Sequence, residues 1–213
     1  MNKKTKFLLI ALCAVFLVAA SVIGTLAYFT DDEQAVNTFT VGKVDIVLDE
    51  AKVDEYGNVI ENADRVTENS YKMIPGHEYV KDPTVTVKAG SEESYVRMLV
   101  TLNKMDEIKT ALGNDFLPQN YVTGWDSTEW PCVSVKDNGD NTATYEFRYY
   151  EIVDDSDELD PLFETIIFPG KLTGEQIANL GDFNIKVVAH AIQADGFNTA
   201  DEAWSAFDAQ VNN

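Results

Sequence analysis

Apolar side chains recur at every second position over several short segments of this chain. The alternation is clearest in Tyr95–Leu102, where valine, methionine and leucine occupy one parity and Arg97 stands on the other. Because successive side chains of a β-strand point to opposite faces, this pattern predicts strands with one face in a core. The same alternation runs through Thr38–Asp49, Thr84–Lys88, Ala143–Tyr150 and Phe183–Ala194, and Pro161–Phe168 is a shorter apolar strand candidate.

Turn signals separate these segments. The parity shifts at Gly42-Lys43, which predicts a bulge or kink, and Glu55–Asn58 has the composition of a turn. Asp137–Asn141 joins two strand candidates and predicts a hairpin. Its side-chain oxygens offer a second interpretation, a Ca²⁺ site, although the spacing of a helix–loop–helix calcium loop is absent.

Helices are expected to be few. Lys104–Leu112 is a short candidate that leads into a Gly-Asn break, and Thr173 and Thr199 each stand three residues before a Gln or Glu, the spacing of a capping box. The second of these starts precedes apolar residues at helical spacing through Val211. Many short strands with a few helices in connections and at the C-terminus predict an all-β fold, an antiparallel two-sheet sandwich, with a closed barrel as the alternative.

The first thirty residues have the layout of a secretory signal peptide. Three lysines precede an uncharged run over Phe7–Thr30, and small residues stand before the best cleavage point, between Ala27 and Tyr28. The alternative is an uncleaved anchor, because Phe7–Ala27 has the length of a membrane-spanning helix of ~20 residues. In both interpretations the lysines stay inside and the rest of the chain lies outside, so we expect a secreted or surface protein that meets the membrane only through an uncleaved leader.

Cysteine content and length limit how such an exported chain can be stabilised. Cys13 lies in the apolar run without the small residues of a lipid-attachment site, so cleavage leaves Cys132 alone, and no intramolecular disulfide can form. Removing 27 of 213 residues leaves 186, enough for a core in a single domain over residues 28–213. We find no internal repeat and no low-complexity linker.

The net charge of the chain is −20, and losing three lysines with the leader makes it −23. This charge argues against nucleic-acid binding, which needs a basic surface. It favours solubility and opposes close self-association unless cations screen it. The same charge allows two interpretations, a generic acidic surface protein or, more specifically, one that binds divalent cations or assembles in a salt-dependent way.

The candidate catalytic and metal-binding residues do not combine into a motif. His77-Glu78 begins the zinc-peptidase pattern, but Lys81 stands where the second histidine is needed. The only other histidine, His190, lies in a strand candidate, on its polar or half-buried face. A Zn²⁺ site from both histidines and a carboxylate is the alternative to two structural histidines. The acidic run Asp154–Asp160 is expected to be a solvated loop, with a metal site as the minority interpretation.

Cys132 follows Trp130-Pro131 in an aromatic and apolar setting, where a free cysteine is typically an inert core residue. A catalytic cysteine would need a histidine base nearby in space. The sequence has neither a nucleophile elbow nor a phosphate-binding glycine loop. We therefore predict no enzyme, no cofactor, and no catalytic or metal-ligating residues.

Four segments together resemble the TasA/camelysin family. The leader end Gly24–Asp31 resembles signal peptides cut by the SipW-type signal peptidase, and Asn37–Ile46 is similar to the first strand of the family. Met73–Val85 is similar to its Leu-x-Pro-Gly strand entry, and Ala189–Phe197 to its final strand, which precedes an Ala-Trp helix. Each motif is short, but the combination spans most of the chain.

The resemblance implies a jelly-roll-like sandwich and a role as a secreted cell-surface or biofilm-matrix fibre subunit. The implied partners are a SipW-type signal peptidase, further copies of the same chain, and other matrix proteins. Camelysin relatives are described as metallopeptidases, but this sequence departs from any clear zinc motif, so we do not carry that activity over.

The resemblance also implies assembly by donor strands, in which the N-terminal segment of one subunit completes a sheet of the next. The candidate donor is Tyr28–Phe39, with Asp31–Glu33 interrupting its apolar positions, and a flexible terminus is the alternative. Two other functions stay open, a camelysin-like surface metallopeptidase and a membrane-anchored adhesin or binding module. The apolar donor positions are Tyr28, Phe29, Val36 and Phe39.

Overall fold

The structure is a computed structural model that describes residues 43–114 and 116–211. The predicted signal peptide, its cleavage point between Ala27 and Tyr28, and the candidate donor positions Tyr28, Phe29, Val36 and Phe39 lie outside the described residues, as does Gly42 of the expected bulge. The fold below is therefore that of the remaining part of the predicted mature domain.

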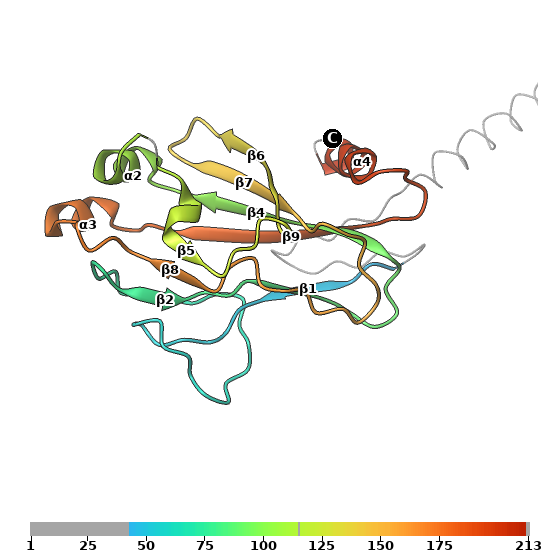
Figure 1. Cartoon of the computed structure of the whole chain (residues 1–213), viewed down its shortest axis with the longest axis horizontal. Coiled ribbons are helices and arrows are strands. Elements are labelled where there is room, and N and C mark those ends of the chain that lie inside the picture. Colours follow the sequence, from blue (N-terminus) through green and yellow to red (C-terminus); the bar gives the residue numbers. More distant parts are fainter. Residues whose placement is uncertain (1–42, 115, 212–213) are drawn as a thin grey trace, which may run out of the picture.

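One layer is a four-stranded antiparallel sheet in the order β6-β7-β4-β9 (Figure 1). The longest strands, β4 and β9, pair over nine residues each, from Ser94 opposite Gln193 to Leu102 opposite Ile185. A hairpin at the predicted turn joins β6 to β7. The strands are β4 (Ser94–Leu102), β6 (Cys132–Asp137), β7 (Ala143–Arg148) and β9 (Ile185–Gln193).

The second layer consists of two short antiparallel sheets, in the orders β1-β3 and β2-β8-β5 (Figure 1). Backbone hydrogen bonds link them, because the chain before β8 runs beside β3: the Leu159 amide donates to the Val85 carbonyl at 2.9 Å, and that of Leu162 to Pro83 at 3.0 Å. The strands are β1 (Ile46–Asp49), β2 (Glu78–Val80), β3 (Thr84–Val87), β5 (Val122–Thr123) and β8 (Thr165–Ile167).

The described residues form three α-helices and one short 3₁₀ helix, all in connections or at the C-terminus. The predicted capping box is confirmed at α3, where Thr173 accepts from the Gln176 amide and the Gln176 side chain accepts from the Thr173 amide. Thr199 likewise accepts from the Glu202 amide at the start of α4. The helices are α2 (Met105–Leu112), η1 (Pro118–Tyr121), α3 (Gly174–Leu180) and α4 (Ala200–Val211).

The core lies between the two layers. The alternation in β4 correctly predicts which face of that strand points into the core. Val96, Met98, Val100 and Leu102 are all buried. The described part of the chain is thus an all-β fold of antiparallel sheets with a few short helices, as the periodicity predicts. Within that part both layers are open sheets rather than a closed barrel.

The outer face of β4 is buried as well, which the alternation does not predict. Helix α4 covers it, and Arg97 is only 4% exposed. Its guanidinium group lies 4.5 Å from the ring of Trp204 and bonds the carboxylate of Asp208 at 2.5 and 3.2 Å. His190 accepts from Arg97 Nε at 3.2 Å and is itself 7% exposed. A buried charge thus fixes α4 onto the sheet through paired groups.

Gly57 lies in the predicted turn before β2, and its substitution tests how much that turn depends on glycine. Its φ is +77°, and a Cβ placed there would lie 2.7 Å from the Cα of Tyr79. Gly139, at the tip of the β6–β7 hairpin, has the same φ of +77° but open space around it. We expect Gly139→Ala to lower the free energy of unfolding by about 1 kcal/mol, and Gly57→Ala by about 3 kcal/mol, because only the second adds a clash with backbone. Urea unfolding of both variants measures the difference, and equal losses would contradict it.

Candidate functional site: an open seam beside strand β9

A long cleft separates β9 from the edge of the other layer. Its larger part has a volume of about 730 Å³ and lies between β1 with the loop at 67–70 on one side and the start of β9 on the other. A second part of about 310 Å³ continues it under β2. We call the two parts together the seam. They share Asn69, Ser70, Lys81, Asn184 and Ile185.

One wall of the seam is an unpaired sheet edge. Strand β9 pairs with β4 and, among the described residues, with no other strand. The amide of Asn103 donates to Asn184, and that of Ala194 donates to Glu93, so even-numbered residues of β9 bond toward β4. Since backbone groups alternate in direction along a strand, the amide and carbonyl groups of Ile185, Val187 and Ala189 point to the free edge. Such groups form a template for another strand.

The seam has an apolar floor and polar walls. Leu48, Ile185 and Val187 are half-buried and pack against the main core. Hydroxyl, amide and charged groups stand above them in the larger part of the cleft, at Thr67, Glu68, Asn69, Ser70, Asn184 and Lys186. An extended peptide has the matching character, because its side chains alternate between two faces while its backbone supplies hydrogen bonds.

A buried ion pair fixes one wall of the seam. Lys81 Nζ lies 2.5 Å from Glu50 Oε2, and the two side chains are 11% and 4% exposed. The Asn69 amide donates to the other Glu50 oxygen at 2.9 Å and to the Ala51 carbonyl at 2.8 Å. Both charges are therefore satisfied within the wall, and they tie the 67–70 loop to β1 and β2.

Tyr71, which follows that loop, is partly buried close to the Lys81–Glu50 pair. Its hydroxyl donates to the Val80 carbonyl at 3.1 Å. Burial, together with the nearby charge of Glu50, raises the pKa of Tyr71. The phenol thus stays protonated and acts as a structural donor rather than a base.

Lys186 is the exposed cation of the seam. In the described structure it makes no ion pair, whereas Lys81 is paired with Glu50. On the acidic side, Asp49 is held by Arg65 at 2.5 Å. The seam therefore presents mostly neutral polar groups, together with the exposed ammonium group of Lys186 and the exposed carboxylates of Glu68 and Asp182.

The two predicted zinc candidates are not brought together. His77 precedes β2 in one layer, where its Nε2 lies 2.7 Å from the Tyr56 carbonyl and its ring packs on Tyr79. His190 lies on the outer face of the other layer, packed against Phe207 under α4. Over residues 43–114 and 116–211, no group of three or more His, Cys, Asp or Glu side chains could hold a metal ion.

Side-chain oxygens of the two acidic loops accept hydrogen bonds from protein donors, mostly within the loops and, for Asp155, from the Gly90 amide at 2.8 Å. The hairpin at Asp137–Asn141 is confirmed, with Asp137 accepting from the Gly139 amide and Asp140 from the Thr142 hydroxyl. In the solvated run Asp154–Asp160, Asp157 accepts from the Asp154 amide. In both described loops the carboxylates accept hydrogen bonds, mostly from turn residues, and they do not converge on a common point where a cation could bind.

The expectation of a core position for Cys132 is wrong. It begins β6, the edge strand of its sheet, and is exposed. Its thiol donates to the Ser134 carbonyl at 3.6 Å, and partial burial raises its pKa, which favours the thiol over the nucleophilic thiolate. The aromatic neighbours in the sequence misled the prediction, because Trp130 turns inward at 1% exposure while the chain leaves the core two residues later.

Three comparisons with known proteins give no match: no family model, no curated protein and no solved structure is similar to this chain. Within the described residues, none of the helices has the length and apolar character needed to cross a membrane.

The Lys81–Glu50 pair can be tested by breaking and then neutralising it. We expect Lys81→Met to lower the free energy of unfolding by about 3 kcal/mol, because it leaves the Glu50 carboxylate buried without its cation. Adding Glu50→Gln should restore about 2 kcal/mol of that loss, since the amide no longer needs a counter-charge. Denaturant unfolding of the single and double variants measures the coupling. A double variant as unstable as the single one would show that the pair is not the cause.

Proposed function

We propose that this protein is a secreted structural subunit of a cell-surface or biofilm-matrix fibre, built as a jelly-roll-like sandwich. In this proposal a SipW-type signal peptidase cuts between Ala27 and Tyr28, and the freed segment Tyr28–Phe39 of one copy adds as a strand to β9 of the next. The observation that carries the proposal is the free edge of β9 above the apolar floor of the seam.

The lengths of donor and acceptor agree. An extended strand rises about 3.3 Å per residue, so the twelve residues from Tyr28 to Phe39 span about 40 Å, and the nine residues of β9 about 30 Å. The donor therefore covers the whole β9 edge and leaves a short connection to its own domain, which the structure describes from Lys43 onward.

The polar walls of the seam account for the acidic interruption in the donor. A wholly apolar groove would reject Asp31, Asp32 and Glu33, because burying unpaired carboxylates is strongly unfavourable. The seam instead offers neutral hydroxyl and amide groups and the exposed ammonium group of Lys186, and the one carboxylate of its larger part that is unpaired among the described residues, Glu68, is exposed to solvent. Its apolar floor remains for the tyrosine, phenylalanine and valine side chains of the donor.

The charge of the protein sets the conditions for assembly. Subunits of charge −23 repel one another over roughly 10 Å at 0.1 M salt, and less at higher ionic strength. The backbone hydrogen bonds of an added strand act at short range and are little affected by salt. Added salt or calcium should therefore promote fibres rather than dissolve them.

Truncation of the donor tests the proposal directly. Protein beginning at Tyr28 should form fibres in electron micrographs as salt or calcium is raised, and protein beginning at Phe39 should stay monomeric. The absence of fibres from both forms under every condition would refute self-assembly. The N-terminus of the native protein is a separate check: we expect Tyr28, whereas an intact Met1 would favour the membrane-anchored adhesin.

A pair of proline substitutions tests which edge accepts the donor. The Val187 amide points to the free edge of β9, so Val187→Pro removes a donor from the seam without breaking the β4–β9 ladder. Val135 is the matched position on β6: it lies opposite Tyr145, one residue from the hydrogen-bonded 136–144 pair, and its amide also points outward. We expect Val187→Pro to abolish fibres and Val135→Pro to retain them, with both monomers folded by circular dichroism. The reverse result would place the acceptor at β6.

A further inference from the structure

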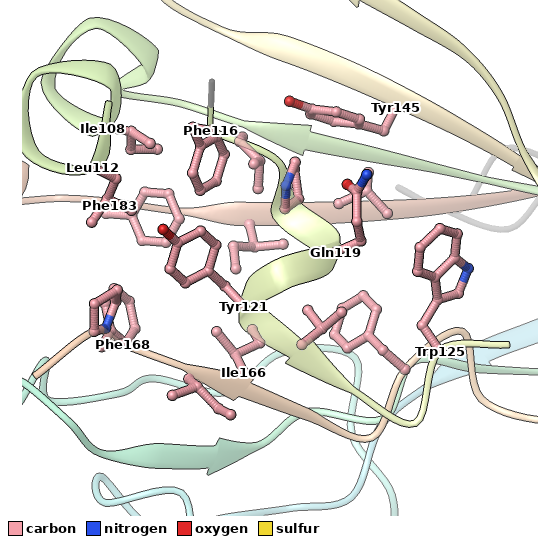
Figure 2. A pocket seen from close by; sticks show the side chains of 18 of the residues that line it. Ile108, Leu112, Phe116, Gln119, Tyr121, Trp125, Tyr145, Ile166, Phe168 and Phe183 are labelled. Atoms are coloured by element: carbon pink, nitrogen blue, oxygen red, sulfur yellow. The ribbon is translucent and has the colours of Figure 1, made fainter. Parts of the chain in front are cut away.

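A second cavity, separate in chemistry from the seam, lies between the layers at the end where α2 and α3 pack. It has a volume of about 100 Å³ and is bounded by both layers and by η1 (Figure 2). Val100 and Leu102 of β4 form part of one side, and Ile166 of β8 part of the other. A wall of the cavity, the edge-to-face pair of Phe168 and Phe183, also lines the smaller part of the seam.

Every lining residue is uncharged, and nearly all of the lining surface is carbon. The polar side-chain groups of the lining are few: the hydroxyl groups of Tyr121 and Tyr145, the Trp125 indole nitrogen and the Gln119 amide. The indole nitrogen of Trp125 donates to the Trp130 carbonyl at 2.8 Å, and Gln119 is an exposed residue of η1. A water molecule needs two to four polar partners to be stable in a cavity, and this lining does not supply them. The cavity therefore favours an apolar occupant over water.

The walls are aromatic on several sides. Phe116 stacks on Tyr121 with ring centroids 5.3 Å apart, and Trp125 meets Phe147 edge to face at 5.9 Å. Flat faces and edges arranged in this way suit a further aromatic ring, because rings attract one another in offset and edge-to-face geometries. An engineered apolar cavity of about 150 Å³ binds benzene, so a cavity of about 100 Å³ bounded on one side by a short exposed turn is of the right order for one ring.

Helix η1 is the exposed wall of the cavity. It is a single four-residue turn with no buried residue, preceded by Leu117, which is 48% exposed. Figure 2 shows Gln119 and Tyr121 of this turn beside the cavity. By contrast, Leu162, Ile108 and Leu180 on the deep side are at most 4% exposed. The cavity therefore lies nearest to solvent on the η1 side and is deeply buried on the other.

We propose that this cavity is a binding site for a small neutral molecule with a single unfused aromatic ring. The ring lies among the aromatic walls, and any polar substituent points past Gln119 to solvent. Charged analogues are excluded, because the lining offers no counter-charge. The proposal does not depend on the fibre function.

Benzene is the probe that tests it. Added to protein beginning at Tyr28, benzene should shift the methyl NMR signals of Ile108 and Leu162 and raise the melting temperature, since it binds only the folded state. Benzoate and benzylammonium at the same concentration should do neither. Unshifted methyl signals at benzene saturation would overturn the proposal.

Cavity-filling variants separate this site from general solvent effects. Ala111 of α2 lines the cavity, and Ala178 of α3 is exposed and outside it. We expect Ala111→Leu to weaken benzene binding at least tenfold, and Ala178→Leu to leave it unchanged. If Ala111→Leu does not fold, Val122→Leu on β5 fills the same space from the other layer. Equal benzene responses in the filled and control variants would place binding elsewhere and refute the assignment.

Discussion

The nine-residue pairing of β4 with β9 is the interaction on which the other features depend. It joins segments that are about ninety positions apart in the chain, from Ser94 opposite Gln193 to Leu102 opposite Ile185. The inward side chains of the pair form the centre of the core, and the outward ones, Arg97 and His190, form the platform for α4. Its far end also supplies Ile185 to both the seam and the apolar cavity. A loss of this register would therefore disrupt the core, the platform for α4, the seam and the cavity together.

Local patterns predict the elements well and their surroundings less well. The alternation through Val96 and Met98 identifies β4 and its buried face, because that face follows from the geometry of one strand. The same alternation places Arg97 on the opposite face but says nothing about α4, which arrives more than one hundred residues later. Cys132 shows the converse error, since apolar neighbours in the sequence do not determine which strand becomes the edge of a sheet.

The candidate site was beyond the reach of sequence reasoning for the same reason. Among the residues that the structure describes, the outer edge of β9 has no paired strand, and a missing pairing leaves no local signal in the sequence. The Lys81–Glu50 pair joins residues 31 positions apart. The local sequence around each of them looks like that of an exposed charged residue. The donor segment is an expectation from the family resemblance alone, and the cleft beside β9 is the place that we propose for it.

The two free edges of the β6-β7-β4-β9 sheet differ in a way that favours β9 as the acceptor. Strand β6 has a bulge between Cys132 and Ser134, and all six of its residues are exposed, with Lys136 among them. Bulges and lysines are devices by which proteins protect an edge against unwanted pairing, and since β9 also carries an exposed lysine, Lys186, the bulge is what distinguishes β6. Strand β9 is regular over its nine residues, and its inward side chains, including Ala189 and Ala191, lie in the core. Among the described residues the β9 edge pairs with no other strand on its outer side, and the cleft opens beside its first residues, Ile185 to Val187.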